Sequence, residues 1–406
     1  MPHLSDLSLN NSRVLLRVDF NVPLNQGGQV VNDKRIQACL PTIHHLIDQG
    51  ASLVIMSHLG RPNSQVVKSL SLKPIAAHLA NLLGRKVKFS DSCVGDAAEA
   101  EVQKLQPGDV LLLENLRFHK EETAGDRGFA KQLAKLGDCY VNDAFGTAHR
   151  AHASTSVIAA EFPGQAAFGL LMEKEITQVD HVIMHAKSPS FAIVGGAKVS
   201  SKIDILDRLI DQVDGILIGG GMSFTFIKAL GGKVGNSLVE DDYVATAQRI
   251  LDRAESKGVH IHLPADVVVG DAFDNEASRQ ICPSDKIPDG WMGLDIGPQA
   301  ITDFSQAIQG AETLLWNGPM GVFEMPNFSQ GTRLVGEAIA TATTSRGAYS
   351  LVGGGDSVAA AAKFNLADRV SYVSTGGGAM LEYLEGKTLP GIQAVWDAMD
   401  TNDHTH

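Results

Sequence analysis

Short apolar segments alternate with segments of helical periodicity along the whole chain. The run VLLRVDF (14–20) predicts a strand, and the apolar residues that follow it recur at helical spacing up to Gly50, at Ile36, Leu40, Ile43 and Ile47. Further strands are predicted at 52–56, 86–89, 110–114 and 139–143, with helices between them. The second half repeats the pattern, with strands predicted at 191–196, 215–220, 259–264, 313–318, 348–354 and 370–374 separated by amphipathic helices. Alternating strands and helices predict an α/β fold of parallel sheets covered by helices.

Two such series predict two doubly wound, parallel-sheet (Rossmann-like) domains. The 406 residues exceed what one hydrophobic core usually serves. The segment MEKEITQVDHVIMHAK, within 165–190, is predicted as a long helix that joins the domains through a hinge. We expect an N-terminal domain over 1–170 and a C-terminal domain over 171–388. The last six residues, TNDHTH, are expected to form a polar tail.

Composition excludes several classes of protein. With 44% hydrophobic residues the chain is neither disordered nor fibrous. No apolar stretch approaches the roughly 18 residues of a membrane span, and the N-terminus lacks the pattern of an export signal, so we expect a cytoplasmic protein without a membrane partner. The four cysteines form no CxxC pair, which fits a reduced compartment. The net charge of −12 argues against a nucleic-acid partner.

The charge is divided unevenly between the two halves. Residues 1–170 contain 17 Lys+Arg and 16 Asp+Glu, whereas residues 171–406 contain 17 and 30. Of the 41 glycines, 28 lie in the second part, many of them in clusters. This contrast indicates two different ligand-binding functions.

The loops that follow the first-domain strands concentrate arginine and histidine. These loops read DFNVP (19–23), SHLGRP (57–62), ENLRFHK (114–120) and DAFGTAHRAH (143–152). In open α/β sheets, ligands bind beyond the carboxyl ends of the strands, and the planar guanidinium suits carboxylate and phosphate. Any one arginine could simply pair with a nearby acid on the surface. Four loops that converge favour a site for a small, multiply anionic substrate.

The corresponding loops of the second domain are rich in glycine. They read GGAK (195–198), GGGMS (219–223), WNGPMGVFE (316–324), GGGDS (353–357) and STGGGA (374–379). Glycine lets backbone N–H groups approach a phosphate, and a helix N-terminus favours its charge. One glycine pair is more often a tight turn than a site, but five successive loops indicate a nucleotide. Asp356 follows three of these glycines and is a candidate carboxylate for a metal–nucleotide complex, although helix capping is an alternative.

The sequence offers no nucleophile for covalent catalysis. Neither a GxSxG nor an HExxH pattern is present. Arginines on one side and glycine-rich loops on the other suit phosphoryl transfer, which depends on positioning and charge neutralisation. Two alternatives stay open on these observations. A dehydrogenase or other small-molecule transferase would need the GxGxxG fingerprint, which is missing. A two-domain anion-binding protein would predict an export signal and no nucleotide loops.

The motifs together resemble those of the phosphoglycerate kinase family along nearly the whole chain. The matching segments are RVDFNVP (17–23), SHLGRP (57–62), LLLENLRFHKEE (111–122), VNDAFGTAHRAHAST (141–155), GGAKVSSKID (195–204), LIGGGMSFTF (217–226), WNGPMGVFE (316–324), GGGDS (353–357) and STGGGAMLEYLEG (374–386). One departure is Ser357, where the family usually has threonine, and it keeps a hydroxyl. The resemblance implies reversible phosphoryl transfer between 1,3-bisphosphoglycerate and MgADP, giving 3-phosphoglycerate and MgATP. It also implies a monomer whose final segment, after about residue 389, packs on the N-terminal domain.

The resemblance further implies the roles of individual residues. The substrate site would contain Asp19, Phe20, Asn21, Arg35, His58, Leu59, Gly60, Arg61, Arg117 and Arg150. The nucleotide site would contain Gly196, Ala197, Lys198, Lys202, Gly219, Gly220, Asn317, Pro319, Glu324, Gly354, Gly355, Asp356 and Ser357. Asp356 would hold Mg²⁺ through the nucleotide, and Glu324 would bind the ribose hydroxyls. Arg35, Lys198 and the N–H groups of Gly376, Gly377 and Gly378 would stabilise the moving phosphoryl group.

Overall fold

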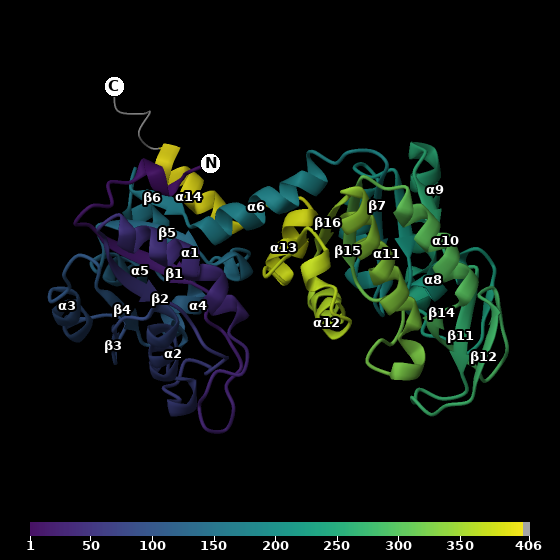
Figure 1. Cartoon of the computed structure of the whole chain (residues 1–406), viewed down its shortest axis with the longest axis horizontal. Coiled ribbons are helices and arrows are strands. Elements are labelled where there is room, and N and C mark those ends of the chain that lie inside the picture. The colour runs from purple at the N-terminus through teal and green to yellow at the C-terminus, as the bar shows by residue number, and fades with distance from the viewer. Residues whose placement is uncertain (401–406) are drawn as a thin grey trace. The chain divides into compact units, whose positions relative to one another are not determined.

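The structure, a computed structural model, describes residues 1–400, and the chain forms two compact units (Figure 1). Unit 1 consists of Met1–Ile176 and the segment from Lys387 onward, and unit 2 consists of Thr177–Gly386. The helix α14 (Pro390–Asp400) lies beside β6 (Ala166–Phe168), where Trp396 meets Phe168 edge-on. The C-terminal segment is thereby part of unit 1. The predicted polar tail, 401–406, lies outside the described residues.

Unit 1 is built on a six-stranded parallel sheet. Its central strands are buried along nearly their whole length, which is why their sequences are mostly apolar and do not alternate. The strands, in spatial order, are β3 (Val87–Ser90), β4 (Val110–Leu113), β2 (Ser52–Met56), β1 (Arg13–Val18), β5 (Cys139–Asp143) and β6. The helices of the unit are α1 (Lys34–Asp48), α2 (Lys73–Leu83), α3 (Asp96–Val102), α4 (Lys120–Ala124), α5 (Arg127–Ala134), α14 and the first part of α6 (Leu170–Ile183).

Unit 2 contains a second six-stranded parallel sheet. Its strands, in spatial order, are β10 (His260–His262), β8 (Gly215–Ile218), β7 (Ser190–Val194), β15 (Thr313–Asn317), β16 (Tyr349–Val352) and β17 (Tyr372–Val373). Its helices are α7 (Ile203–Leu209), α8 (Ser223–Ala229), α9 (Val244–Lys257), α10 (Pro298–Gln309), α11 (Gln330–Arg346), α12 (Gly355–Lys363) and α13 (Gly378–Leu384). Two parallel sheets, each with helices packed around it, confirm the predicted α/β class (Figure 1).

The prediction of strictly alternating elements is wrong between β10 and β15. This stretch folds into an antiparallel sheet of β12 (Arg279–Pro283), β11 (Asp266–Gly270) and β14 (Met292–Ile296), while β13 (Lys286–Ile287) pairs in parallel with β9 (Lys233–Val234). The apolar face of the antiparallel sheet packs on α8, where Val267 and Val269 meet Phe224. Exposed β12 lacks the apolar run by which the other strands were recognised.

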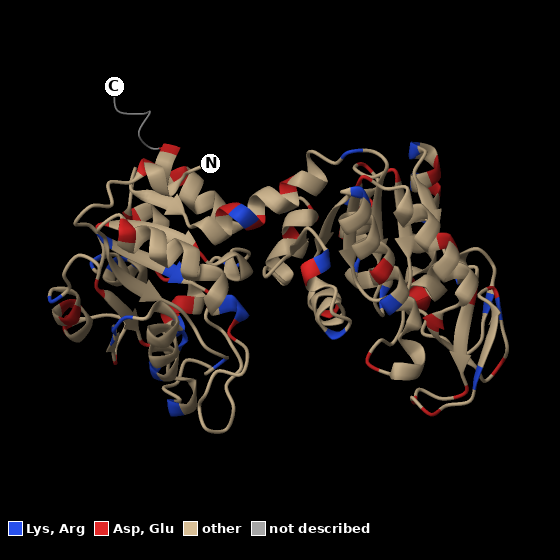
Figure 2. Cartoon of the chain, viewed as in Figure 1, with Lys and Arg blue, Asp and Glu red and all other residues tan. Residues whose placement is uncertain are grey.

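Charged residues of both signs are interspersed over the helices and loops of both units (Figure 2). Part of the acidic excess of the second half is paired locally, as where Asp207 binds both Arg249 and Arg253. None of the helices within residues 1–400 combines the length and the hydropathy that a membrane crossing requires.

Candidate active site

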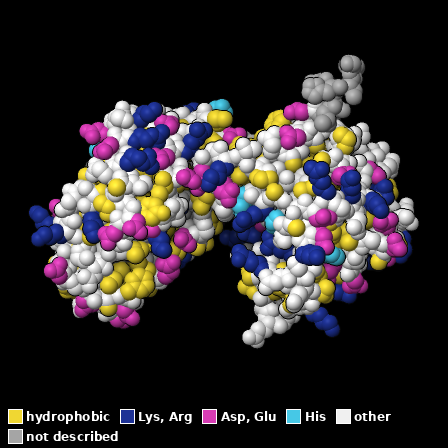
Figure 3. Space-filling model, turned by 180° about the vertical axis from the view of Figure 1, so that it is seen from behind, with side chains coloured by type: hydrophobic (Ala, Val, Ile, Leu, Met, Phe, Trp, Pro, Cys, Tyr) yellow, Lys and Arg dark blue, Asp and Glu magenta, His cyan; other side chains and the backbone are white. Residues whose placement is uncertain are grey.

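A basic cradle lies at the carboxyl ends of the strands of unit 1. Its loops follow four strands. The loop after β1 contains Asp19 and Asn21, and the loop after β2 contains His58. Arg117 follows β4, and the segment that ends at Arg150 follows β5. Because these strands are parallel and adjacent, their carboxyl ends lie at one edge of the sheet. On the surface of unit 1, lysine and arginine side chains gather together with histidines (Figure 3).

Hydrogen bonds fix the shape of this cradle. Arg35, at the start of α1, donates to Asp19 Oδ2 at 3.0 Å and to the carbonyl oxygen of Asn21 at 3.2 Å. The Asn21 side chain accepts from the amide of Gly60 at 2.9 Å, and Arg117 donates to the carbonyl oxygen of Gly60 at 3.0 Å. Loops after three different strands are therefore held in one arrangement by side chains that the sequence singled out.

Arg17 is a member of this cluster that the sequence reasoning missed. It lies within β1, is fully buried, and donates to Ser154 Oγ at 2.8 Å and to the carbonyl oxygen of Val18. The Ser154 hydroxyl in turn donates to the buried carboxylate of Glu122 at 2.6 Å. A buried charge needs a partner, and the Arg17–Ser154–Glu122 chain provides it. The available signal was an arginine in the middle of an otherwise apolar strand.

Arg17 also determines the state of His58. Its guanidinium lies 3.2 Å from Nδ1 of His58, and since arginine can only donate, Nδ1 must accept. The proton of the neutral ring is then on Nε2, which faces Asp19 Oδ1 at 3.9 Å. Burial, together with the charges of Arg17 and Arg117, holds the pKa of His58 well below its usual range. His58 therefore acts as a neutral hydrogen-bond donor at neutral pH.

The remaining predicted substrate residues divide into two groups. Arg61 and Arg150 are exposed, and their charges help to lower the pKa of Arg117 and of His152 respectively, which places both at the cradle. Phe20 and Leu59 have buried side chains, and their amides bind Ser57 and Asn115, so these two residues contribute backbone position and core packing. In the cradle as a whole, arginine and histidine side chains outnumber the acidic ones. This arrangement favours an anion with more than one negative charge.

The histidines of the cradle lead to an expected pH dependence of stability. Burial and the neighbouring arginines lower the pKa of His152 to about 4, below the roughly 6.5 expected in the unfolded chain. Unfolding then takes up a proton between these values, so we expect the free energy of unfolding to fall as the pH is lowered from about 6.5 towards 4. His152→Gln should reduce that slope in urea unfolding. His44→Gln, at an exposed position on α1, should leave it unchanged, and equal slopes in the wild type and His152→Gln would contradict the assignment.

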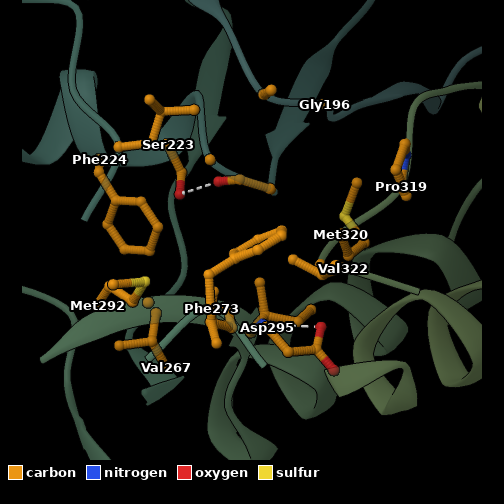
Figure 4. Close-up of a pocket in the computed structure, with 18 of the residues that line it drawn as sticks. Gly196, Ser223, Phe224, Val267, Phe273, Met292, Asp295, Pro319, Met320 and Val322 are labelled. Carbon is orange, nitrogen blue, oxygen red and sulfur yellow. Dashed lines mark hydrogen bonds between the residues drawn. The ribbon is translucent and has the colours of Figure 1, made fainter. Parts of the chain in front are cut away.

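Among the cavities of unit 2, two share part of their lining. The first has a volume of about 330 Å³ and is mainly apolar. In Figure 4, the ring of Phe273 lies between Phe224 and Met292 on one side and Met320 and Val322 on the other. Of the predicted nucleotide residues, those that line it are Gly196, Ala197, Gly220, Pro319, Glu324 and Asp356. We refer to it as the apolar cavity.

The second cavity, of about 420 Å³, is lined by lysines and glycine-rich loops. The predicted residues in its wall are Gly196, Ala197, Lys198, Lys202, Asn317, Gly354, Gly355, Asp356 and Ser357. Because Gly196, Ala197 and Asp356 also line the apolar cavity, the two spaces adjoin. We refer to this second space as the polar cavity.

Close contacts between loops explain the glycines of these walls. Gly220 has φ of +69°, and a Cβ there would lie 2.6 Å from the carbonyl oxygen of Gly196. Ser357 Oγ accepts a hydrogen bond from the amide of Gly318 at 2.6 Å. The hydroxyl at the position that departs from the family pattern therefore joins two loops. Asn317 donates to the carbonyl oxygen of Gly353 at 2.7 Å and accepts from Lys202. Burial lowers the pKa of Lys202, against the opposing charges of Asp356 and Glu385.

Four predicted residues lie outside both linings. Gly219 packs on Met320, and Gly376, Gly377 and Gly378 form the entry to α13, whose residue Leu381 lines the polar cavity. The sequence reasoning in turn missed most of the apolar wall, namely Phe224, Leu238, Val267, Phe273, Met292, Leu294, Met320 and Val322. These residues come from five separate segments. Phe224, Met320 and Val322 lie within the motifs quoted above, but apolar residues usually signal core packing, so the motifs did not mark them as cavity residues.

Within residues 1–400, no group of three or more His, Cys, Asp and Glu side chains could hold a metal ion. Asp356 occupies the first turn of α12, with an exposed carboxylate at the point where both cavities meet. A single carboxylate beside a space for phosphates fits a hard cation that takes its other ligands from a nucleotide and water.

A parallel α/β unit with a basic cradle and a second unit with glycine-lined cavities define the class of enzymes that transfer phosphoryl groups between a nucleotide and a small anion.

Comparisons with known proteins specify the family. The family profile described as phosphoglycerate kinase matches residues 4–387. The phosphoglycerate kinases of Moorella thermoacetica and Parasynechococcus marenigrum are each 52% identical to the chain, over 97% and 96% of its length and 98% and 96% of their own. The solved structure of phosphoglycerate kinase from Coxiella burnetii has a TM-score of 0.89 and 41% identity, and covers 97% of this chain and 98% of its own.

The chain belongs to the phosphoglycerate kinase family. It is a glycolytic phosphotransferase that moves a phosphoryl group between 1,3-bisphosphoglycerate and ADP.

Proposed function

We propose that the two units divide the substrates of this reaction, with 3-phosphoglycerate on the basic cradle of unit 1 and the magnesium nucleotide in the two cavities of unit 2. The observation that carries this division is the contrast in chemistry between the sites. The cradle offers arginine forks and neutral histidines, whereas unit 2 offers an apolar space joined to a glycine- and lysine-lined space. A carboxylate with a phosphate suits the first, and a base joined to a phosphate chain suits the second.

Within unit 2, we propose that the base and ribose occupy the apolar cavity and the phosphates occupy the polar cavity. Glu324, which lines the apolar cavity, would accept hydrogen bonds from the ribose hydroxyls. Lys198, Lys202 and the backbone at Gly354–Gly355 would bind the phosphate chain, with α12 beginning directly behind it. Asp356 would hold Mg²⁺ bound to the nucleotide, and Mg²⁺ when bound supplies positive charge to the phosphate oxygens.

The proposed residues account for a reaction without a general base. In the direction that consumes ATP, the attacking group is the carboxylate of 3-phosphoglycerate, which is already ionised at neutral pH because carboxylic acids of this kind have a pKa of about 4. The transition state needs instead positive charge and N–H groups around the moving phosphoryl. We assign this role to Arg35, Lys198 and the amides of Gly376–Gly378. Since these groups belong to different units, we propose that the units close on each other during in-line transfer and exclude water.

We also propose that the protein acts as a monomer in the cytoplasm. The family resemblance implies a monomer, and the substrates are small anions of glycolysis, which fits the cytoplasm.

Calorimetric titration of single-site variants tests the division of substrates. Arg117→Ala should weaken 3-phosphoglycerate binding about 10- to 100-fold and leave nucleotide binding unchanged, because one charge-assisted contact contributes about 1.5–3 kcal/mol. Lys202→Ala should do the reverse. Arg127→Ala on α5 and Lys257→Ala on α9, both at exposed positions, are matched controls that should affect neither ligand. Loss of nucleotide affinity in Arg117→Ala with 3-phosphoglycerate affinity retained would overturn the proposal.

A further inference from the structure

The chain passes between the two units twice, and one hydrogen bond joins the two passages on the side of unit 2. The first passage is at Ile176/Thr177, within α6, and the second is at Gly386/Lys387, shortly after α13. Asp180 lies four residues beyond the first passage and Tyr383 four residues before the second. Tyr383 donates its hydroxyl to Asp180 Oδ1 at 2.9 Å.

This bond is made by side chains that are partly withdrawn from solvent. Both residues are of intermediate exposure. Burial raises the pKa of Asp180, against the hydrogen bond from Tyr383, and burial together with Asp180 raises the pKa of Tyr383. The phenol therefore stays protonated and donates to a carboxylate, a hydrogen bond of the stronger, charge-assisted kind.

On its other side, α13 is connected to the polar cavity. Leu381 of this helix lines the cavity. Glu385, which follows the helix, interacts with the charge of Lys202, which also lines it. The loop Gly376–Gly378 leads directly into the helix. A displacement of α13 along or about its axis would therefore move Leu381, the partner charge of Lys202 and the N–H groups of the loop together.

A second tyrosine also binds α6, from the sheet of unit 2. Tyr349, at the start of β16, donates to the carbonyl oxygen and to Oε1 of Gln178, each at 3.0 Å, and its ring lies 4.0 Å from that of His181. It attaches α6 to the sheet. Tyr383 alone of these two tyrosines attaches α6 to the helix beside the polar cavity.

We propose that Asp180 and Tyr383 are a positioning pair that holds α13 against α6 and so sets the Gly376–Gly378 loop and Leu381 for phosphoryl transfer. The pair touches no substrate and acts through α13. The inference rests on the proposed placement of the phosphates in the polar cavity, a placement that Lys202→Ala tests separately. A misplaced loop affects the transition state more than the bound ground state, because hydrogen bonds to the moving group require accurate geometry.

The test is steady-state kinetics of Tyr383→Phe, which removes only the hydroxyl. We expect kcat to fall about 5- to 20-fold, while the KM values for ATP and 3-phosphoglycerate stay within about twofold of wild type. Asp180→Ala should lower kcat by the same factor, and the double variant should lose no more than either single variant. Asp180→Asn keeps an oxygen that can accept from Tyr383, so it should retain most of the activity.

Tyr349→Phe is the matched control, since it removes from β16 a tyrosine hydroxyl that binds the same helix, α6. Its kcat should stay within about twofold of wild type. The proposal is overturned if Tyr383→Phe keeps wild-type kcat, if Tyr349→Phe loses as much, or if the losses in Tyr383→Phe and Asp180→Ala multiply in the double variant. Should Tyr383→Phe fail to fold, the comparison of Asp180→Asn with Asp180→Ala decides the question, and equal kcat in those two variants would contradict the proposal. If Lys202→Ala leaves nucleotide binding intact, the placement of the phosphates is wrong, and a fall of kcat in Tyr383→Phe would then show only that the pair positions α13 for catalysis, not that it does so at the phosphates.

Discussion

Replacing Arg35 by alanine is expected to lower kcat by two or more orders of magnitude. Arg35 begins α1 beside the cradle, where one guanidinium nitrogen is held by Asp19 at 3.0 Å and by the carbonyl oxygen of Asn21 at 3.2 Å. These bonds fix the plane of the guanidinium while its side chain remains 39% exposed, so it is oriented and still reachable by a ligand. Loss of one charge contact made in the transition state costs about 2.7–4 kcal/mol, which corresponds to a factor of 10²–10³ in rate.

The measurement is a coupled assay of turnover with ATP and 3-phosphoglycerate, with kcat and both KM values determined. Lys34→Ala removes the neighbouring exposed positive charge from the same helix and is the control, expected to stay within a few-fold of wild type. Arg35→Lys keeps the charge without the planar fork and should fall between the two. If Arg35→Ala keeps kcat within a few-fold and raises only the KM for 3-phosphoglycerate, Arg35 positions the substrate and the transition-state role assigned to it is wrong.

The parallel sheets and their ligand loops could be predicted together, because each apolar strand run is followed directly by the polar residues of its loop. A buried parallel strand is a continuous apolar run, as in β2 and β4, and the polar residues that follow it lie at the ligand-binding edge. His58 and Arg117 were found in this way. The same reasoning could not find Arg17, because its side chain lies inside the sheet and its importance depends on Ser154 and Glu122, more than 100 residues away in the sequence.

The apolar cavity could not be predicted for a related reason. Its wall combines Phe224 from α8, Phe273 from the β11–β12 connection and Met320 from the loop after β15. Each of these residues has the local signature of ordinary core packing, and only the tertiary structure shows that they surround a space. The antiparallel sheet that supplies part of this wall was itself missed, because β11 is only partly buried and β12, which is mostly exposed, lacks an apolar run. Charged residues at strand ends were therefore easier to predict than the apolar residues that shape the cavity.

In the proposed mechanism, the charged residues and the apolar residues have different tasks. The groups that would neutralise phosphate charge stand at strand ends and helix starts: Arg35 supplies its own positive charge, and Asp356 would hold the Mg²⁺ that supplies more. Part of the wall of the apolar cavity, where we propose that the base and ribose bind, comes from the antiparallel sheet, which the basic α/β pattern does not contain. On this proposal, the charged residues would act on the moving phosphoryl group, and the apolar residues would recognise the nucleotide that supplies it.

Replacing Asp356 by asparagine is expected to weaken binding of the magnesium nucleotide by about 10- to 100-fold and to leave 3-phosphoglycerate binding unchanged. Asp356 is an exposed carboxylate in the first turn of α12, in the lining of both cavities. The asparagine keeps the size and one oxygen of the side chain but removes its charge. A hard divalent cation bound to phosphate oxygens therefore loses its anionic protein ligand. The nucleotide without metal should bind no more weakly than to wild type, since the substitution removes a negative charge near its phosphates.

Calorimetric titrations of ADP with excess magnesium, of ADP with a chelator and of 3-phosphoglycerate separate these effects. Asp242→Asn, at an exposed position of the same unit, is the control and should change none of the three affinities. If Asp356 served only as a helix cap, Asp356→Asn would lower stability and would change affinity equally with and without magnesium. Equal losses for the magnesium nucleotide and for 3-phosphoglycerate would contradict the assignment, because the two ligands are proposed to bind different units. A loss confined to the magnesium nucleotide would identify Asp356 as the protein ligand that couples the metal to the phosphates.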